Sequence, residues 1–159
     1  MKVLFWLSII FLLYTYFGYP LFMSILTKVK KTKPINKKFI TPYISIVISA
    51  YNEEKNIGAK LNDIINIAYP HEKMEIFVIS DASTDGTDEI VKGYSDRGVK
   101  LLRLEKRSGK IAAYHKIFPY LKGEIIVFSD AASLLHRESI TNLISNFNDE
   151  SVGCVGGLL

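Results

Sequence analysis

Residues 44–54 read ISIVISAYNEE, an apolar and largely β-branched run that stops at a polar and acidic segment. Apolar residues then recur at helical spacing from 57 to 68, and Pro70 ends that pattern. A short apolar run followed by a 3.6-residue period is typical of a buried strand and an amphipathic helix. We therefore expect a strand at 44–49, a polar loop and a helix.

The same arrangement recurs along the chain. Residues 75–79 (EIFVI) end at Ser80-Asp81, and residues 124–128 (EIIVF) end at Ser129-Asp130. Strands that are apolar throughout and joined by helix-length connections predict an α/β fold, a mostly parallel sheet with helices on both faces. The further elements expected are a helix over about 88–94, a strand at 99–104, helices at 110–121 and 137–147, and the start of another strand at 151–155.

Polar side chains gather where these strands end. In parallel sheets, ligands bind beyond the carboxyl ends of the strands, so these positions are the candidate site. Asp81 and Asp130 are the most informative, because a carboxylate that ends an apolar strand is costly without partners. Asp85 is interpreted as a helix cap and Arg107 as a solvated charge. The residues at these strand ends are Tyr51, Asn52, Glu53 and Glu54 after the first strand, Asp81 and Asp85 after the second, the basic run 106–110 after the third, and Asp130 after the fourth.

Charge divides the chain into two parts. The 159 residues carry a formal charge of +4, but residues 1–40 hold seven lysines and no acid, which leaves −3 for residues 41–159. The basic balance therefore does not indicate nucleic-acid binding by the main domain. The single cysteine, Cys154, excludes an internally disulfide-stapled secreted module.

The first segment is predicted to span a membrane. Residues 3–26 form an uncharged run of 24 residues, long enough to cross a hydrocarbon core of about 30 Å. A cleaved signal peptide is the alternative, but the run is long and no A-x-A-like site follows it. The expected organisation is an anchor at 1–27, a basic linker at 28–42 and a main domain at 43–159. Aromatic residues within the run suit the membrane interfaces or the helix of a partner subunit.

Six lysines between 28 and 38 follow the apolar run. Lysine-rich segments beside a membrane span usually stay in the cytoplasm. We therefore expect a single-pass protein with its N-terminus outside and its main domain inside. The same lysines could attract anionic membrane lipid, although a topology signal alone explains them.

Familiar nucleotide and metal motifs are missing. No G-x-G-x-x-G follows the first strand, and Ser108-Gly109-Lys110 lacks the earlier glycine and the following hydroxyl residue of a P-loop. The three histidines do not have metal-ligand spacing with the lone cysteine.

Four ordered segments, SIVISAYNEE, FVISDASTDGTDEI, LEKRSGKIAA and EIIVFSDAAS, resemble the nucleotide-sugar half of the family 2 glycosyltransferases with the GT-A fold. The resemblance covers residues 43–159 and is greatest to membrane-anchored, polysaccharide-synthase-like members. It implies that Tyr51, Asn52 and Glu53 cradle the nucleotide of a donor, that Asp81 contacts the uracil end, and that Gly109 and Lys110 lie beside the nucleotide. It also implies that the first acid of a D-x-D motif, here Asp130, lies near the ribose and a divalent cation, Mg²⁺ or Mn²⁺.

Two features depart from that family. Alanine stands at 132, where the last acid of the D-x-D motif is expected, and a methyl group cannot bind a divalent cation. The acceptor half, which carries the general base, is not found before Leu159, so we expect this chain to be a fragment or truncated product. The implied reaction is transfer of a sugar, UDP-linked, to an acceptor hydroxyl with inversion.

Two rival functions remain open. One is a non-enzymatic, membrane-tethered nucleotide-sugar binder or assembly partner. The other is a membrane-anchored phosphate-binding α/β module of another kind, which does not explain the order of the motifs.

Overall fold

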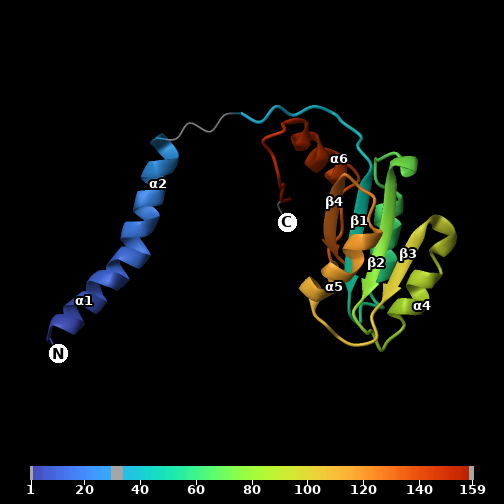
Figure 1. The fold of residues 1–159 in the computed structure, drawn as a ribbon, viewed down its shortest axis with the longest axis horizontal. Helices are drawn as coiled ribbons and strands as arrows, with labels where there is room; N and C mark the ends of the chain where they lie inside the picture. Colours follow the sequence, from blue (N-terminus) through green and yellow to red (C-terminus); the bar gives the residue numbers. More distant parts are fainter. Residues whose placement is uncertain (1, 30–33, 158–159) are drawn as a thin grey trace. The chain divides into compact units, whose positions relative to one another are not determined.

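The structure, a computed structural model, describes residues 2–29 and 34–157. The chain divides into two compact units, residues 1–35 and 36–159. Figure 1 shows the elements of both units. The helices are α1 (Lys2–Leu13), α2 (Tyr19–Val29), α3 (Ile57–Ile65), α4 (Thr87–Lys92), α5 (Lys110–Ile117) and α6 (Ser139–Ile144), and the strands are β1 (Ile44–Ala50), β2 (Met74–Ser80), β3 (Val99–Arg103) and β4 (Ile125–Asp130).

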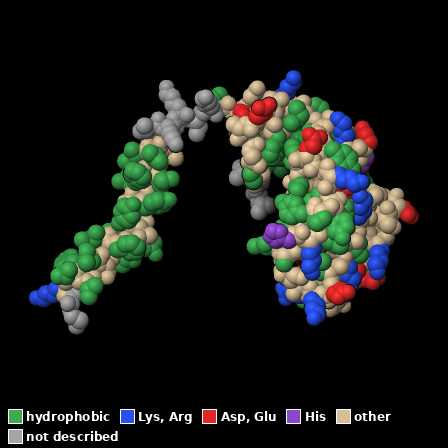
Figure 2. Space-filling view, in the orientation of Figure 1, with side chains coloured by type: hydrophobic (Ala, Val, Ile, Leu, Met, Phe, Trp, Pro, Cys, Tyr) green, Lys and Arg blue, Asp and Glu red, His purple; other side chains and the backbone are tan. Residues whose placement is uncertain are grey.

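The first unit is a helix long and apolar enough to cross a membrane, over Lys2–Lys28, although a signal sequence would pass the same test. Hydrophobic side chains cover it in Figure 2. Between α1 and α2 the chain forms a π-helix over Tyr14–Gly18, in which the N–H of Tyr19 donates to the carbonyl of Tyr14. Pro20 follows directly, and since proline has no N–H for the usual bond to residue 16, a widened turn keeps the helix continuous. Lys30, Lys31 and Lys33 of the expected linker lie outside the described residues.

The second unit confirms the expected α/β architecture. Four parallel strands form one sheet in the order β3-β2-β1-β4. Alternate residues of β1 face opposite sides, so Ile46 and Ile48 pack with α3, α4 and α6 on one face. Val47 packs on the other face with Ala113 and Ile117 of α5. The sheet is therefore covered on both faces, as Figure 1 shows.

Buried polar contacts fix the amino-terminal ends of the strands. The Ser45 hydroxyl donates to Glu75 at 2.7 Å and accepts from the Gly123 N–H at 2.8 Å. A Cβ at Gly123 would lie 2.3 Å from the backbone nitrogen of Ser45, so only glycine fits there. Nearby, Lys38 donates its N–H to the carbonyl of Ser145, and Asn36 donates to Asp149. The last part of the expected linker thus packs on the second unit.

Several sequence-based boundaries differ from the structure, among them the helical pattern from 57 to 68, of which α3 covers only Ile57–Ile65. The expected helix at 110–121 ends at Ile117 and continues as a 3₁₀ turn, since Pro119 cannot donate a helical hydrogen bond. The expected helix at 137–147 covers only Ser139–Ile144 before another 3₁₀ turn. The expected strand at 151–155 is not formed in the part of the chain that the structure describes, because no neighbouring strand pairs with this glycine-containing segment.

Candidate functional site

The strand register brings the two key aspartates to the same edge of the sheet. Asp130 is the last residue of β4 and lies beside Ser49 of β1. Asp81 directly follows β2, and its N–H donates to the carbonyl of Ala50 at 3.0 Å. The two carboxylates therefore flank the end of β1 on opposite sides, as the parallel arrangement predicted.

A pocket of about 390 Å³ opens at this edge. Six of the seven residues that the family resemblance assigns to donor binding line it, the exception being Asn52. The complete lining is Ser49, Ala50, Tyr51, Glu53, Ile79, Asp81, Arg107, Gly109, Lys110, Ala113, Asp130, Ala131 and Ala132. The residues come from the ends of β1, β2 and β4 and from the loop that leads into α5.

Asp81 holds the loop before α5 in place. Its side chain is buried, with 8% of its surface exposed, and its two oxygens accept the N–H groups of Ser108 at 2.7 Å and Gly109 at 2.9 Å. Gly109 has φ of +81°, a conformation that side chains with a Cβ rarely adopt. The sequence pattern at 108–110 therefore reflects a tight turn that presents Lys110 at the start of α5.

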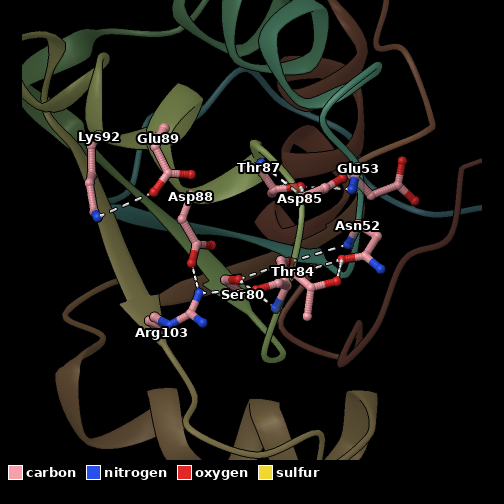
Figure 3. A network of polar contacts seen from close by, with 11 residues as sticks. Asn52, Glu53, Ser80, Thr84, Asp85, Thr87, Asp88, Glu89, Lys92 and Arg103 are labelled. Carbon is pink, nitrogen blue, oxygen red and sulfur yellow. Dashed lines mark hydrogen bonds and ion pairs between the residues drawn. The ribbon is translucent and has the colours of Figure 1, made fainter.

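Asn52 joins two loops instead of lining the pocket. It adopts φ of +53°, which asparagine tolerates better than most residues. Its side-chain oxygen accepts the N–H of Thr84 at 2.8 Å, and its own N–H donates to the Ser83 hydroxyl at 3.2 Å. The adjacent N–H of Glu53 donates to the Thr87 hydroxyl at 2.8 Å. Figure 3 shows these contacts tying the segment after β1 to the segment after β2.

The same network contains Asp85, which was interpreted as a helix cap. Its carboxylate accepts the N–H of Thr87, the first residue of α4, at 3.1 Å, and the N–H of Glu54 at 3.2 Å. These bonds outweigh the opposing effect of desolvation and lower the pKa of Asp85. The N-cap residue of α4 is Gly86, so Asp85 satisfies one N–H of the first turn from the position before the cap. Asp88 of α4 pairs with Arg103 at the end of β3, as Figure 3 also shows.

Arg107 is a pocket residue that sequence reasoning missed. It was interpreted as a solvated charge, and it is exposed, but its guanidinium also lies 4.0 Å from the centroid of the Tyr51 ring. An arginine over an aromatic face gains a cation–π interaction, and the two side chains together form one wall of the pocket. The available signal was its position directly before the turn at Ser108 and Gly109, in the loop that follows β3.

Lys110 and Asp130, which both line the pocket, form an ion pair. The hydrogen bond from Lys110 lowers the pKa of Asp130, and the same bond raises the pKa of Lys110. Both side chains are about half exposed, at 51% and 59% of their surfaces, so solvent screening keeps the pair's contribution to stability small. The pair is therefore free to open for a ligand at little cost.

The residues around Asp130 fit poorly as a resident metal site. Ala132 offers only a methyl group. The carboxylate of Asp130 is already engaged in the ion pair with Lys110. Among residues 2–29 and 34–157, no group of three His, Cys, Asp or Glu side chains could hold a metal ion. Divalent cations of the Mg²⁺ type need several oxygen ligands, so at the D-x-D position of the described chain Asp130 supplies one carboxylate where the family pattern has two.

Comparison with known proteins adds to this geometry. Residues 45–159 match the family described as Glycosyl transferase family 2. A beta-monoglucosyldiacylglycerol synthase of Nostoc sp. (strain PCC 7120) is 31% identical over 118 residues, which cover 72% of this chain and 25% of that protein.

Two solved structures resemble the fold. The mannosyltransferase PcManGT from Pyrobaculum calidifontis, in complex with GDP-Man and Mn²⁺, has a TM-score of 0.80 and 30% identity and covers 91% of this chain. The S. aureus TarS 1–349 complex with UDP-GlcNAc has a TM-score of 0.61 and 29% identity and covers 67% of this chain. The chain spans between 25% and 44% of the length of these three proteins.

Proposed function

The chain belongs to glycosyl transferase family 2, as its four ordered motifs predicted, and we propose that its pocket binds the nucleotide-diphosphate part of a sugar donor. The proposed reaction of the whole protein is transfer of the sugar from a UDP-linked donor to an acceptor hydroxyl with inversion. The observation that carries this proposal is that residues from four separate segments, chosen from sequence alone, line one pocket at the carboxyl edge of a parallel sheet.

The proposed roles follow from the chemistry of each side chain. Tyr51 supplies an aromatic face for the base, and Asp81 holds the loop that carries Arg107 and Lys110. These two cations stabilise the negative charge that develops on the departing diphosphate. Removing the acceptor proton requires a general base, and we assign no residue of this chain to that role.

The proposal of a nucleotide-sugar donor is also supported by the solved neighbours, which hold GDP-Man and UDP-GlcNAc. We propose UDP because the segment sequences resemble UDP-using members of the family. For the acceptor, the same resemblance favours a growing polysaccharide at the membrane. Mn²⁺ accompanies the donor in one neighbour. In this chain a divalent cation would have Asp130 as its ligand, with the donor's phosphate oxygens supplying others.

We further propose that the N-terminal helix is a retained anchor that places residues 36–159 in the cytoplasm. The support is the apolar span over Lys2–Lys28 together with the six lysines that follow it in the sequence.

The test is titration of UDP and of GDP into the full chain in lipid nanodiscs, by calorimetry, with and without Mn²⁺. We expect saturable UDP binding that Lys110→Met weakens by about fivefold or more, the size of a lost charge-assisted contact. Lys92→Met, which removes an exposed lysine of α4, is the matched control and should leave the affinity unchanged. Absence of saturable UDP binding, or preference for GDP, would overturn the UDP assignment.

A non-enzymatic nucleotide-sugar binder is the second candidate, and the lone carboxylate beside Ala132 favours it. Sugar transfer by the whole protein, assayed with radiolabelled UDP-sugars, separates the two. Binding without transfer or donor hydrolysis would support the binder.

A further inference from the structure

Lys60 of α3 is a buried cation that the functional interpretation above does not use. None of its surface is exposed, although lysine is among the residue types least often fully buried. Its ammonium donates to the carbonyl of Ser133 at 2.5 Å and lies 3.4 Å from the Ser133 hydroxyl. Ser133 follows the Asp130-Ala131-Ala132 segment, which lines the pocket, so Lys60 supports that turn from behind.

The turn links Lys60 to Asp130 through a short chain of contacts. The Ser133 hydroxyl donates to the carbonyl of Asp130 at 3.0 Å, and the Ser133 N–H donates to the same oxygen at 3.3 Å. Ser133 therefore connects the Lys60 ammonium to the residue that ends β4.

The charge on Lys60 is incompletely balanced. Among the described residues, no carboxylate forms an ion pair with it. Burial lowers the pKa of Lys60, and the more distant charges of Asp63 and Asp130 act in the opposite direction. A buried ammonium without a close anion is costly to the fold. An anion bound on the pocket side of the turn would reduce that cost, and by linkage the buried charge would strengthen binding of the anion.

We propose that Lys60 is a positioning residue that holds the Asp130–Ser133 turn and supplies a fixed positive charge for the diphosphate of the bound nucleotide. This inference rests on the proposed function. Unlike Lys110 and Arg107, which reach the pocket, Lys60 does not touch the donor. Because the ammonium is buried, its charge stays in place. This fixed charge favours binding of a diphosphate and disfavours binding of a divalent cation near Asp130. A site with a single carboxylate can in this way bind UDP with little dependence on a divalent ion.

The experiment uses the full chain in nanodiscs, in EDTA, with UDP and uridine as the probes. Lys60→Met removes both the charge and the hydrogen bond, whereas Lys60→Gln keeps a hydrogen-bond donor without the charge. We expect both variants to bind UDP about tenfold more weakly than the wild type, the effect of one unit charge acting across several ångströms in protein surroundings. Competition by uridine, which has no phosphate, should be unchanged in both. Lys92→Gln, which removes one exposed positive charge, should bind UDP as the wild type does.

The outcomes separate the two proposals. If the wild type binds no UDP, the proposed function itself fails. If the wild type binds UDP and both Lys60 variants keep an affinity within about twofold, only the inference about Lys60 fails. A full rescue by glutamine would reduce Lys60 to a hydrogen-bonding role and overturn its role as a charge. Replacing a buried charge by an apolar residue is often neutral or stabilising for the fold. If both variants nevertheless failed to fold, Lys60 would be required for stability of the fold, and this result would also contradict the inference.

Discussion

Replacing Asp81 by alanine removes the brace under the loop that carries the pocket's cations. Two charge-assisted hydrogen bonds, to the N–H groups of Ser108 and Gly109, are lost. Bonds of this kind contribute about 1.5–3 kcal/mol each, which gives an upper limit of about 3–6 kcal/mol. Two effects reduce it. The variant no longer buries a carboxylate, and Ser108 and Gly109 are exposed, so water replaces the lost acceptor.

We therefore expect Asp81→Ala to lower the free energy of unfolding by about 2 kcal/mol. Urea unfolding of the full chain in nanodiscs, followed by pulse proteolysis, measures it. With a slope near 2 kcal/mol per molar urea, the midpoint should fall by about 1 M. Asp96→Ala, at an exposed position, is the matched control. A change below about 0.5 kcal/mol in Asp81→Ala would refute the bracing role, since that is the size of an ordinary surface substitution.

Three further predictions concern pH, metal and topology. Hydrogen bonds to buried Glu75 outweigh desolvation and lower its pKa from 4.5, so its stabilising effect is present above that value and is lost as pH falls through the lowered pKa. Glu75→Gln should therefore be less stable than the wild type at pH 7, with a difference in urea midpoint that shrinks as the pH falls through the lowered pKa of Glu75; a difference independent of pH would contradict this. Ala132→Asp should raise Mn²⁺ affinity in the presence of UDP, and equal affinities would mean that residue 132 is not at the cation position. Exposed Cys154 should resist a membrane-impermeant maleimide in intact cells and react after lysis, whereas labelling of intact cells would reverse the proposed orientation.

The sheet and the edge at which its pocket opens were predictable because apolar runs and the polar residues that end them are local signals. The expected strand at 44–49 needed only the addition of Ala50. The expected strand at 151–155 failed because a strand requires a pairing partner, which an apolar run does not encode.

Individual roles in the site were less predictable than its location. Asn52 was expected beside the nucleotide but uses its side chain to join two loops, and Arg107, which is exposed as expected, also lies over the ring of Tyr51. Both depend on loop conformation, in particular on φ of +53° at Asn52 and +81° at Gly109, which periodicity does not report. For Lys60 a signal did exist. It lies three residues after Ile57 and one before Leu61, on the buried face of α3.

The central claim is that a nucleotide binds at the carboxyl edge of the sheet, and photolabelling tests it most directly. The full chain in nanodiscs is irradiated with 5-azido-UDP, and the labelled residues are mapped by mass spectrometry. We predict label within 49–53 or 107–113, suppressed by excess UDP, because these segments form the wall around Tyr51 and Arg107. UDP-sensitive label confined to other parts of the chain, such as 83–92, would contradict the account.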